Sequence, residues 1–371
     1  LFNELHRPVL KQLMRPMALL ARNLDPTRLI LDESGGWAFG ANMYLPSEYE
    51  PMKFNDIHNY PGPFINQEQF DGYLSVGLTD QQKKFKGFSG STPGRNLVPG
   101  LMSFVSELGY GSLPDLTINN KLFKEDGNSL TPAYRYHERI HRQQKRVIFE
   151  SGFNEMYPNM QKFYLDQQEI HGNSNKRMIE AVRSNPNIKG YCIHALIAGD
   201  WIFGAGLIDL WRNPKNDVYQ RTKEGNESRI LSIRIFPRNV YSDELTNIRL
   251  VGINDLNTIR GQLTIQVLDE NGNIVFSKTE SQDFKSGIHQ LFNKKISTDN
   301  LEGKYQVNAF IKNSDEMILA KNTHSFDVFK ARNYNEMKFA IFGSPEKLNS
   351  FLLKNKISYS KFNKRTSKET P

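Results

Sequence analysis

The chain has 371 residues, of which 38% are hydrophobic and 24% charged, so its composition indicates a globular protein of two or three domains. No apolar run reaches the roughly 20 residues that a membrane-spanning helix needs, which argues against membrane insertion. The single cysteine, Cys192, excludes an intramolecular disulfide.

The chain begins with LFNEL at residues 1–5, which is typical of the end of a strand, and we expect further chain upstream of it. Short apolar strands then alternate with helical or irregular stretches as far as about residue 225. The predicted strands are RLILDES (28–34), FNDIHNYPGP (54–63), LMSFVSELGYG (101–111) and GYCIHAL (190–196), and NKRMIEAVRS (175–184) has helical spacing. Strands separated in this way predict parallel pairing with crossover connections.

In these predicted strands the polar residues gather at the C-terminal end or just after it. The residues concerned are Asp32, Glu33, Ser34, Asp56, His58, Tyr60, Glu107, Asp200 and Trp201. An α/β barrel carries its chemistry on the loops that follow its strands. Glu107 is the most informative, because an unpaired carboxylate is costly to bury and a glycine-rich turn follows it directly. We therefore predict that Glu107 lies in a cleft at the mouth of a strand.

The character of the sequence changes near Arg229, where short strands with period-2 alternation follow one another without helical spacing. The predicted strands are 230–236, 247–253, 262–269, 273–278, 304–312, 317–321 and 324–330. Asn271-Gly272 between two of them is a hairpin signal, and the set predicts an immunoglobulin-like β-sandwich. A strand, a helix and a second strand are predicted within residues 337–362.

The sequence thus divides into three predicted segments: 1–225 with mixed α/β character, 226–331 as the β-sandwich, and 332–371 as the start of a further α/β domain or a basic tail. The formal net charge is +8, which invites a nucleic-acid interpretation. However, residues 354–369 alone carry five lysines and one arginine against one glutamate. A solvated tail explains most of this excess better than a polyanion site does, so we predict no nucleic-acid partner.

Five stretches occur in an order that resembles glycoside hydrolase family 2, the family of β-galactosidases, β-glucuronidases and β-mannosidases. They are LFNEL (1–5), DPTRLILDESGG (25–36), DIHNYPGP (56–63), FVSELGYG (104–111) and GYCIHALIAGDWIFGAGLIDLWRNPK (190–215). The resemblance covers roughly residues 1–330. It implies the C-terminal half of a TIM (β/α)8 barrel, strands four to eight, followed by an immunoglobulin-like sandwich and a short α/β tail.

The same resemblance implies a site. Glu4, in the pair Asn3-Glu4, takes the position of the general acid/base, and Glu107 takes that of the nucleophile. The implied sugar-binding residues are Asn3, His58, Tyr60, Asp200 and Trp201. Retaining hydrolysis uses two carboxyl groups about 5–5.5 Å apart, one to attack the anomeric carbon and one to transfer the proton. The implied activity is a retaining exo-acting β-glycosidase with a carbohydrate substrate, no metal and no cofactor.

Other interpretations stay open at the level of the sequence. GYCIHAL lacks the tryptophan that is frequent in strand eight of the family, and His194 comes nearest to it. The alternative function is therefore a non-catalytic carbohydrate-binding relative. Glu4 is also compatible with a frayed N-terminal acid or a helix-start charge before Pro8, and Glu107 with a strand-end acid paired to an arginine or to a helix N-terminus.

One further motif competes with this interpretation. HERIH at residues 137–141 matches the H-E-x-x-H zinc-protease helix. Its flanks are polar and basic, whereas a zinc-site helix should be half buried, and no third ligand is evident. We therefore predict a solvated, arginine-rich helix in an insertion of the barrel.

Overall fold

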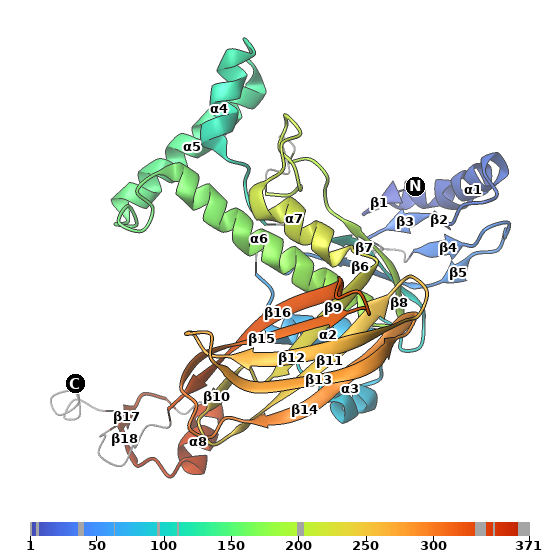
Figure 1. The fold of residues 1–371 in the computed structure, drawn as a ribbon. Coiled ribbons are helices and arrows are strands. Elements are labelled where there is room, and N and C mark those ends of the chain that lie inside the picture. Colours follow the sequence, from blue (N-terminus) through green and yellow to red (C-terminus); the bar gives the residue numbers. More distant parts are fainter. Residues whose placement is uncertain are drawn as a thin grey trace.

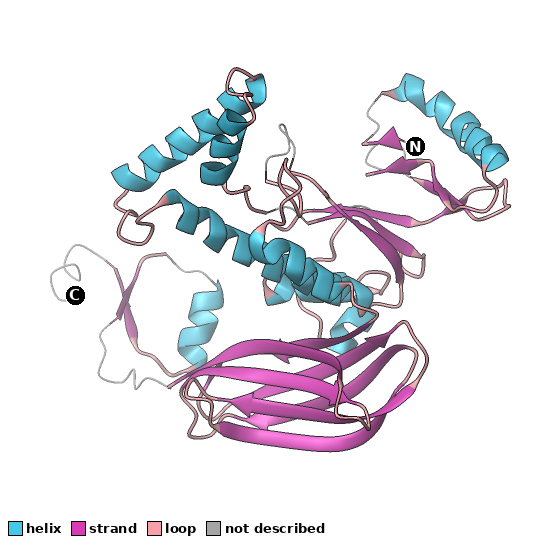
Figure 2. Ribbon diagram, turned by 45° about the horizontal axis from the view of Figure 1, so that its top comes forward, coloured by secondary structure: helices cyan, strands magenta, loops and turns pink. Residues whose placement is uncertain are grey.

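The computed structural model describes residues 2–4, 7–35, 41–62, 64–94, 97–109, 111–198, 204–330, 339–343 and 346–362. The fold mixes helices and sheets, as predicted. Figure 1 shows short strands and helices in the N-terminal part and large sheets in the C-terminal part, with the long helix α6 (Met160–Arg183) beside them. Figure 2 shows α4 (Leu116–Glu125) and α5 (Pro132–Glu150) projecting away from the sheets.

The N-terminal part consists of a helix and several short strands. The elements are β1 (Phe2–Asn3), α1 (Pro8–Leu24), β2 (Ile30–Leu31), β3 (Glu33–Ser34), β4 (Asn42–Tyr44) and β5 (Met52–Lys53). β1 pairs with β3 in parallel, whereas β2, β4 and β5 form an antiparallel sheet. The predicted strand at 28–34 is therefore divided between two sheets. It breaks at Asp32, whose buried carboxylate accepts hydrogen bonds from the backbone and side-chain nitrogens of Asn42, both at 2.7 Å.

A parallel sheet follows, with strands in the order β6 (Asn55–Asn59), β7 (Ser103–Leu108) and β8 (Ile188–Ile193). Helices α2 (Gln67–Leu74) and α3 (Asp80–Lys86) connect β6 to β7, α4 to α6 connect β7 to β8, and α7 (Asn216–Gly225) follows β8. The sheet packs on α2 and α6 through a buried apolar core that includes Ile57, Phe70, Val105, Met178 and Ile179. The predicted parallel pairing is confirmed for these strands, and the predicted helix at 175–184 is the end of α6.

The C-terminal part is a pair of facing sheets, residues 229–329, which we call the sheet pair. Its strands are β9 (Arg229–Phe236), β10 (Asn239–Tyr241), β11 (Leu245–Asn254), β12 (Ile259–Leu268), β13 (Ile274–Phe284), β14 (Gly287–Ser297), β15 (Gly303–Lys312) and β16 (Ile318–Phe329). One sheet has the order β14-β11-β9 and the other β10-β16-β15-β12-β13. The side chains buried between them include Ile233, Leu250, Ile265, Val307 and Phe326.

Two strand predictions in this part are wrong. The stretches 317–321 and 324–330 belong to the single strand β16. Strand β14 was not predicted, because most of its side chains are exposed and its buried residues are not evenly spaced. The predicted hairpin is confirmed: β12 and β13 pair antiparallel, and Gly272 in their connection has a φ of +82°, which favours glycine.

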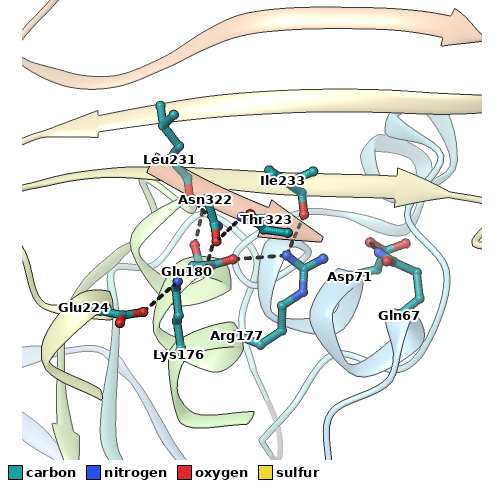
Figure 3. A network of polar contacts seen from close by, with 11 residues as sticks. Gln67, Asp71, Lys176, Arg177, Glu180, Glu224, Leu231, Ile233, Asn322 and Thr323 are labelled. Carbon is teal, nitrogen blue, oxygen red and sulfur yellow. Dashed lines mark hydrogen bonds and ion pairs between the residues drawn. The ribbon is translucent and has the colours of Figure 1, made fainter. Parts of the chain in front are cut away.

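Buried polar contacts join the sheet pair to the helices. Asp71 of α2 accepts two hydrogen bonds of 2.7 Å from Arg234 of β9. A second network, shown in Figure 3, centres on Glu180 of α6, which accepts hydrogen bonds from Arg177 at 3.1 Å and from Asn322 of β16 at 2.8 Å. Because the partners come from both parts of the chain, these contacts fix the sheet pair against α2 and α6.

The last described elements are β17 (Phe339–Ile341), α8 (Glu346–Lys354) and β18 (Tyr359–Lys361), and the two strands pair in parallel. This is the strand, helix and strand order predicted within 337–362. The last part of the predicted basic tail, residues 363–371, lies outside the described residues. In the part of the chain that the structure describes, no helix is both long enough and apolar enough to cross a membrane.

Candidate active site

Glu107 and His58 lie side by side where β7 and β6 end. The two strands are parallel, and their register pairs His58 with Glu107. The His58 Nε2 atom lies 3.0 Å from Glu107 Oε1, and the two side chains are 2% and 17% exposed. Gly109, just after β7, has a φ of +111°, which favours glycine and lets the chain turn immediately. The Glu107 carboxylate therefore stands at the end of its strand, next to an imidazole.

Glu4 reaches the other side of the same imidazole from β1. Its backbone N–H donates to Ser34 O at 2.8 Å, which continues the pairing of β1 with β3. Its Oε1 atom lies 3.2 Å from His58 Nδ1, and its side chain is 35% exposed. The structure thus brings the two predicted carboxylates to the two nitrogens of one histidine ring.

Gly35, which follows β3, packs against this cluster. Its φ of +83° favours glycine. A Cβ atom at this position would lie 2.8 Å from Glu4 Cγ and 2.9 Å from His58 Nδ1. A larger residue would therefore displace the glutamate, the histidine or the turn itself.

The electrostatics of the cluster centre on His58. Burial alone would lower the pKa of His58, but the carboxylates of Glu107, Asp56 and Glu4 raise it above the ordinary value of 6.5. Burial also raises the pKa of Asp56, which lies two residues earlier in β6. A protonated His58 balances one carboxylate charge, so the cluster keeps excess negative charge when Glu4 and Glu107 are both ionised.

Two aromatic rings border the cluster. The ring centroid of Tyr60 lies 5.9 Å from that of His58 and 5.8 Å from that of His194. His194 Nε2 lies 4.0 Å from Glu107 Oε2. Tyr60 is 37% exposed, so part of its side chain reaches solvent.

The remaining predicted site residues have different positions. Asn3 precedes Glu4 in the chain, and its exposed Oδ1 atom accepts a hydrogen bond from Ser34 Oγ at 2.8 Å. Asp200 and Trp201 lie outside the described residues. Asn3 is thus anchored to the end of β3, beside the cluster.

The sequence analysis assigned no role to Gly35 or Asp56, and named His194 only as a substitute for tryptophan. A signal for Asp56 was present, because alternation along a strand puts it on the same face as His58 and Tyr60. The signal for Gly35 was a Gly-Gly pair directly after a strand that ends in acids. Neither pattern tells which side chains these residues meet.

The two histidines of HERIH make contacts other than metal coordination. His137 of α5 is buried, and its ring packs edge-on against Phe123 with centroids 5.1 Å apart. His141 Nδ1 lies 3.0 Å from the Tyr164 hydroxyl. Among the described residues, no group of three or more His, Cys, Asp or Glu side chains could hold a metal ion. The segment is helical, as predicted, but it is not the solvated stretch that the sequence predicted: only Arg139 is exposed, His137 is buried and the other three residues are half-buried.

No protein-family model and no curated protein matches the sequence. Among solved structures, the exo-chitosanase CsxA of Amycolatopsis orientalis is 16% identical, with a TM-score of 0.41, over 74% of this chain and 30% of that one. The β-glucuronidase 2 of Bacteroides uniformis is 16% identical, with a TM-score of 0.21, over 28% of this chain and 13% of that one. For the β-glucuronidase of Parabacteroides merdae the values are 16%, 0.21, 30% and 17%. The chain spans less than a third of the length of each of these structures.

Proposed function

We propose that the protein is a retaining exo-acting β-glycosidase of the glycoside hydrolase family 2 type, which removes terminal β-linked sugars from oligo- or polysaccharides. One observation carries the proposal: Glu4 and Glu107, from different strand ends, contact the two ring nitrogens of His58. Two carboxyl groups in one cluster are the groups that glycoside hydrolysis requires, and the retaining outcome is carried over from the family resemblance.

The contacts of Glu107 leave one of its oxygens able to react. Glu4 and Glu107 both use the Oε1 atom for the contact with His58. The Oε2 atom of Glu107 lies 4.0 Å from His194 Nε2, which is longer than a hydrogen bond. This oxygen of Glu107 is therefore available for the anomeric carbon.

In the proposed reaction, Glu107 attacks the anomeric carbon while a protonated Glu4 gives its proton to the departing oxygen. The bond to the leaving group breaks as the glycosyl-enzyme bond forms. Glu4 then takes a proton from a water molecule, and the water oxygen displaces Glu107 from the anomeric carbon. These two groups supply both the nucleophile and the proton transfer, so the proposal includes no cofactor and no metal.

The sugar is held by residues around the two acids. We assign Asn3 to the 2-hydroxyl of the sugar and the Tyr60 hydroxyl to the nucleophile, to which it would donate. The rest of the subsite is assigned to Asp200 and Trp201. His58 was expected to bind the sugar as well, but its side chain is 2% exposed and both of its ring nitrogens contact the carboxylates, so we assign it to positioning the two acids.

We also propose that residues 1–225 are strands four to eight of a TIM (β/α)8 barrel, that 226–331 is an immunoglobulin-like sandwich, and that 332–371 begins a further α/β domain. Parallel pairing of β1 with β3, and of β6, β7 and β8 with helices between them, supports the barrel. The first boundary is supported by the end of α7 at Gly225 and the start of β9 at Arg229.

The test is mechanism-based labelling of the full-length protein with a set of 2-deoxy-2-fluoro glycosides that carry a good leaving group. We expect a covalent sugar on the peptide that contains Glu107, and none in Glu107→Gln. The control is Glu125→Gln, which removes one acid of an exposed ion pair with Lys121 on α4 and should still be labelled. A sugar attached to another residue would overturn the assignment.

A second candidate is a carbohydrate-binding protein without turnover, favoured by His194 at the place where the family carries a tryptophan. Calorimetric titration with monosaccharides separates the two. Binding without hydrolysis, unchanged in Glu107→Gln, supports this candidate, whereas labelling of Glu107 eliminates it.

A further inference from the structure

A second polar site lies far from the carboxylates, between the sheet pair and the helices. It is a cavity of about 220 Å³ that is lined by residues of α2, α3, β9, β11 and β14. The turn at residues 184–187, which leads into the start of β8, closes one side. Because Glu107 stands near the opposite, C-terminal ends of the parallel strands, this cavity has no part in the proposed hydrolysis.

The cavity contains two arginines on neighbouring strands. Arg234 of β9 and Arg249 of β11 are direct cross-strand partners, and like charges in this position repel each other. Asp71 neutralises Arg234 through two hydrogen bonds of 2.7 Å. Arg249 forms no ion pair with any described residue, and its buried Nε atom has no hydrogen-bond partner among them. One positive charge is therefore left unbalanced.

This imbalance is costly to the folded protein. Arg249 is half-buried, and burial and then the neighbouring Arg234 lower its pKa, while Asp71 opposes them. A guanidinium does not lose its proton in a protein, so deprotonation gives no relief. A buried donor without an acceptor adds to the cost. Lys86 contributes a further cation, and none of the described residues that line the cavity is an aspartate or a glutamate.

The rest of the wall is largely apolar. Phe70, Leu74, Phe88, Val251 and Ile288 all line the cavity. The guanidinium carbon of Arg249 lies 6.0 Å from the centroid of the Phe88 ring. The cavity thus offers a cationic end and an aromatic surface at adjacent positions.

We propose that this cavity binds a small aromatic carboxylate, with its carboxylate on Arg249 and its ring against Phe88. A carboxylate matches the forked donors of a guanidinium and supplies the missing acceptor. An aromatic body fills the apolar wall, which an inorganic anion would leave in contact with water. The ligand would touch α2, α3 and the sheet pair together, and so would tie the two parts of the chain to each other.

The experiment uses the full-length protein and three probes: phenylacetate, the neutral phenylacetamide, and inorganic phosphate. Calorimetric titration should show saturable binding of phenylacetate, and Tm should rise because the ligand binds only the folded state. Arg249→Gln should weaken this binding about tenfold or more, since the carboxylate loses its charged partner. The control is Arg260→Gln, an exposed arginine of β12 paired with Asp283, which should leave Kd unchanged.

Several outcomes would overturn the proposal. Equal binding by the protein and by Arg249→Gln, or equal binding of phenylacetamide, removes the role of the charge, and phosphate binding as tight as that of phenylacetate removes the role of the ring. No saturable binding of phenylacetate rejects the site. Arg249→Gln should fold with a Tm no lower than that of the parent protein, because it relieves the repulsion from Arg234. If it does not fold, Ile288→Trp, which fills the cavity, should abolish binding while Arg249 remains.

Discussion

Two clusters of charged side chains in this protein use similar residues and differ in charge balance. Where the parallel strands end, Glu4 and Glu107 share the single ring of His58, and the two glutamates are 35% and 17% exposed. At the joint between α2 and the sheet pair, Asp71 and Arg234 pair one to one and are 0% and 8% exposed. The first cluster has more acids than bases and faces solvent, whereas the second pair is neutral and buried.

The difference separates a candidate site from a structural contact. Besides the two hydrogen bonds from Arg234, Asp71 accepts hydrogen bonds from Gln67 at 2.8 Å and from Ser89 Oγ at 3.1 Å, so its oxygens are fully engaged. Glu107 has an oxygen whose distance to His194 exceeds that of a hydrogen bond. Both clusters are charged. The cluster of Glu4, Glu107 and His58 differs from the Asp71–Arg234 pair because its charge is in excess and lies at an accessible strand end.

The largest expected effect comes from removing the nucleophile. Glu107→Gln should reduce kcat of the full-length enzyme roughly 10⁴–10⁶-fold, the range for loss of a residue that acts within a catalytic unit. Its Tm should stay close to that of the parent protein, because the substitution keeps the shape and removes a charge from an acid-rich cluster. Kinetics on an aryl glycoside that the enzyme accepts measure the effect. Activity within tenfold of the parent protein would mean that another residue attacks the sugar.

Removing the acid of the buried Asp71–Arg234 pair should instead lower the stability of the fold. Asp71→Asn leaves Arg234 buried without its counter-charge, and we expect a loss of about 3–5 kcal/mol in the free energy of unfolding. The matched control is Asp283→Asn, whose exposed pair with Arg260 should contribute less than about 1 kcal/mol. Denaturant unfolding of both variants provides the measurement. A similar loss in the two variants would remove the contrast between buried and exposed pairs.

A smaller effect on activity is expected at Gly35. Gly35→Ala adds a Cβ that would lie 2.8 Å from Glu4 Cγ, and displacement of the acid/base should reduce kcat roughly 10²-fold. Gly272→Ala is the matched control, because its φ of +82° is similar and no atom lies within 4 Å of the added Cβ. Both variants should lose stability through backbone strain, but only the first should lose activity. Equal activity in the two would show that the Gly35 contact does not position the acid.

The sequence predicted those features that depend on neighbouring residues. The end of β7 was visible because an apolar run meets an acid and then a glycine within a few positions. The joint of Asp71 with Arg234 was not, since its partners are 163 residues apart and nothing near either one indicates the other. In the same way, the double contact of His58 depends on the register of β6 with β7 and on the close approach of Gly35. The two acids were named through resemblance, and only the fold shows that one imidazole touches both.

The smallest expected effect is the change with pH in the stability that His58 contributes. It tests whether the charge of His58 offsets the negative charges of the acid-rich cluster. Its folded-state pKa is raised above 6.5 by Glu107, Asp56 and Glu4 against the lowering effect of burial. The charged ring therefore stabilises the fold fully below the unfolded-state pKa, and this stabilisation is lost as the pH rises through the folded-state value. The difference in unfolding free energy between the parent protein and His58→Gln should accordingly stay constant below about pH 6.5, the ordinary histidine value, and shrink as the pH rises above it.

NMR titration of the His58 ring gives the direct measurement. Glu107→Gln removes the strongest of the charged partners and should lower the His58 pKa, whereas Glu125→Gln on α4 should leave it unchanged. If the ring titrates at the same pH in all three proteins, the carboxylates do not govern its charge. His58 would then not respond to the acids that surround it, and the proposed charge balance of the Glu4, Glu107 and His58 cluster would be wrong.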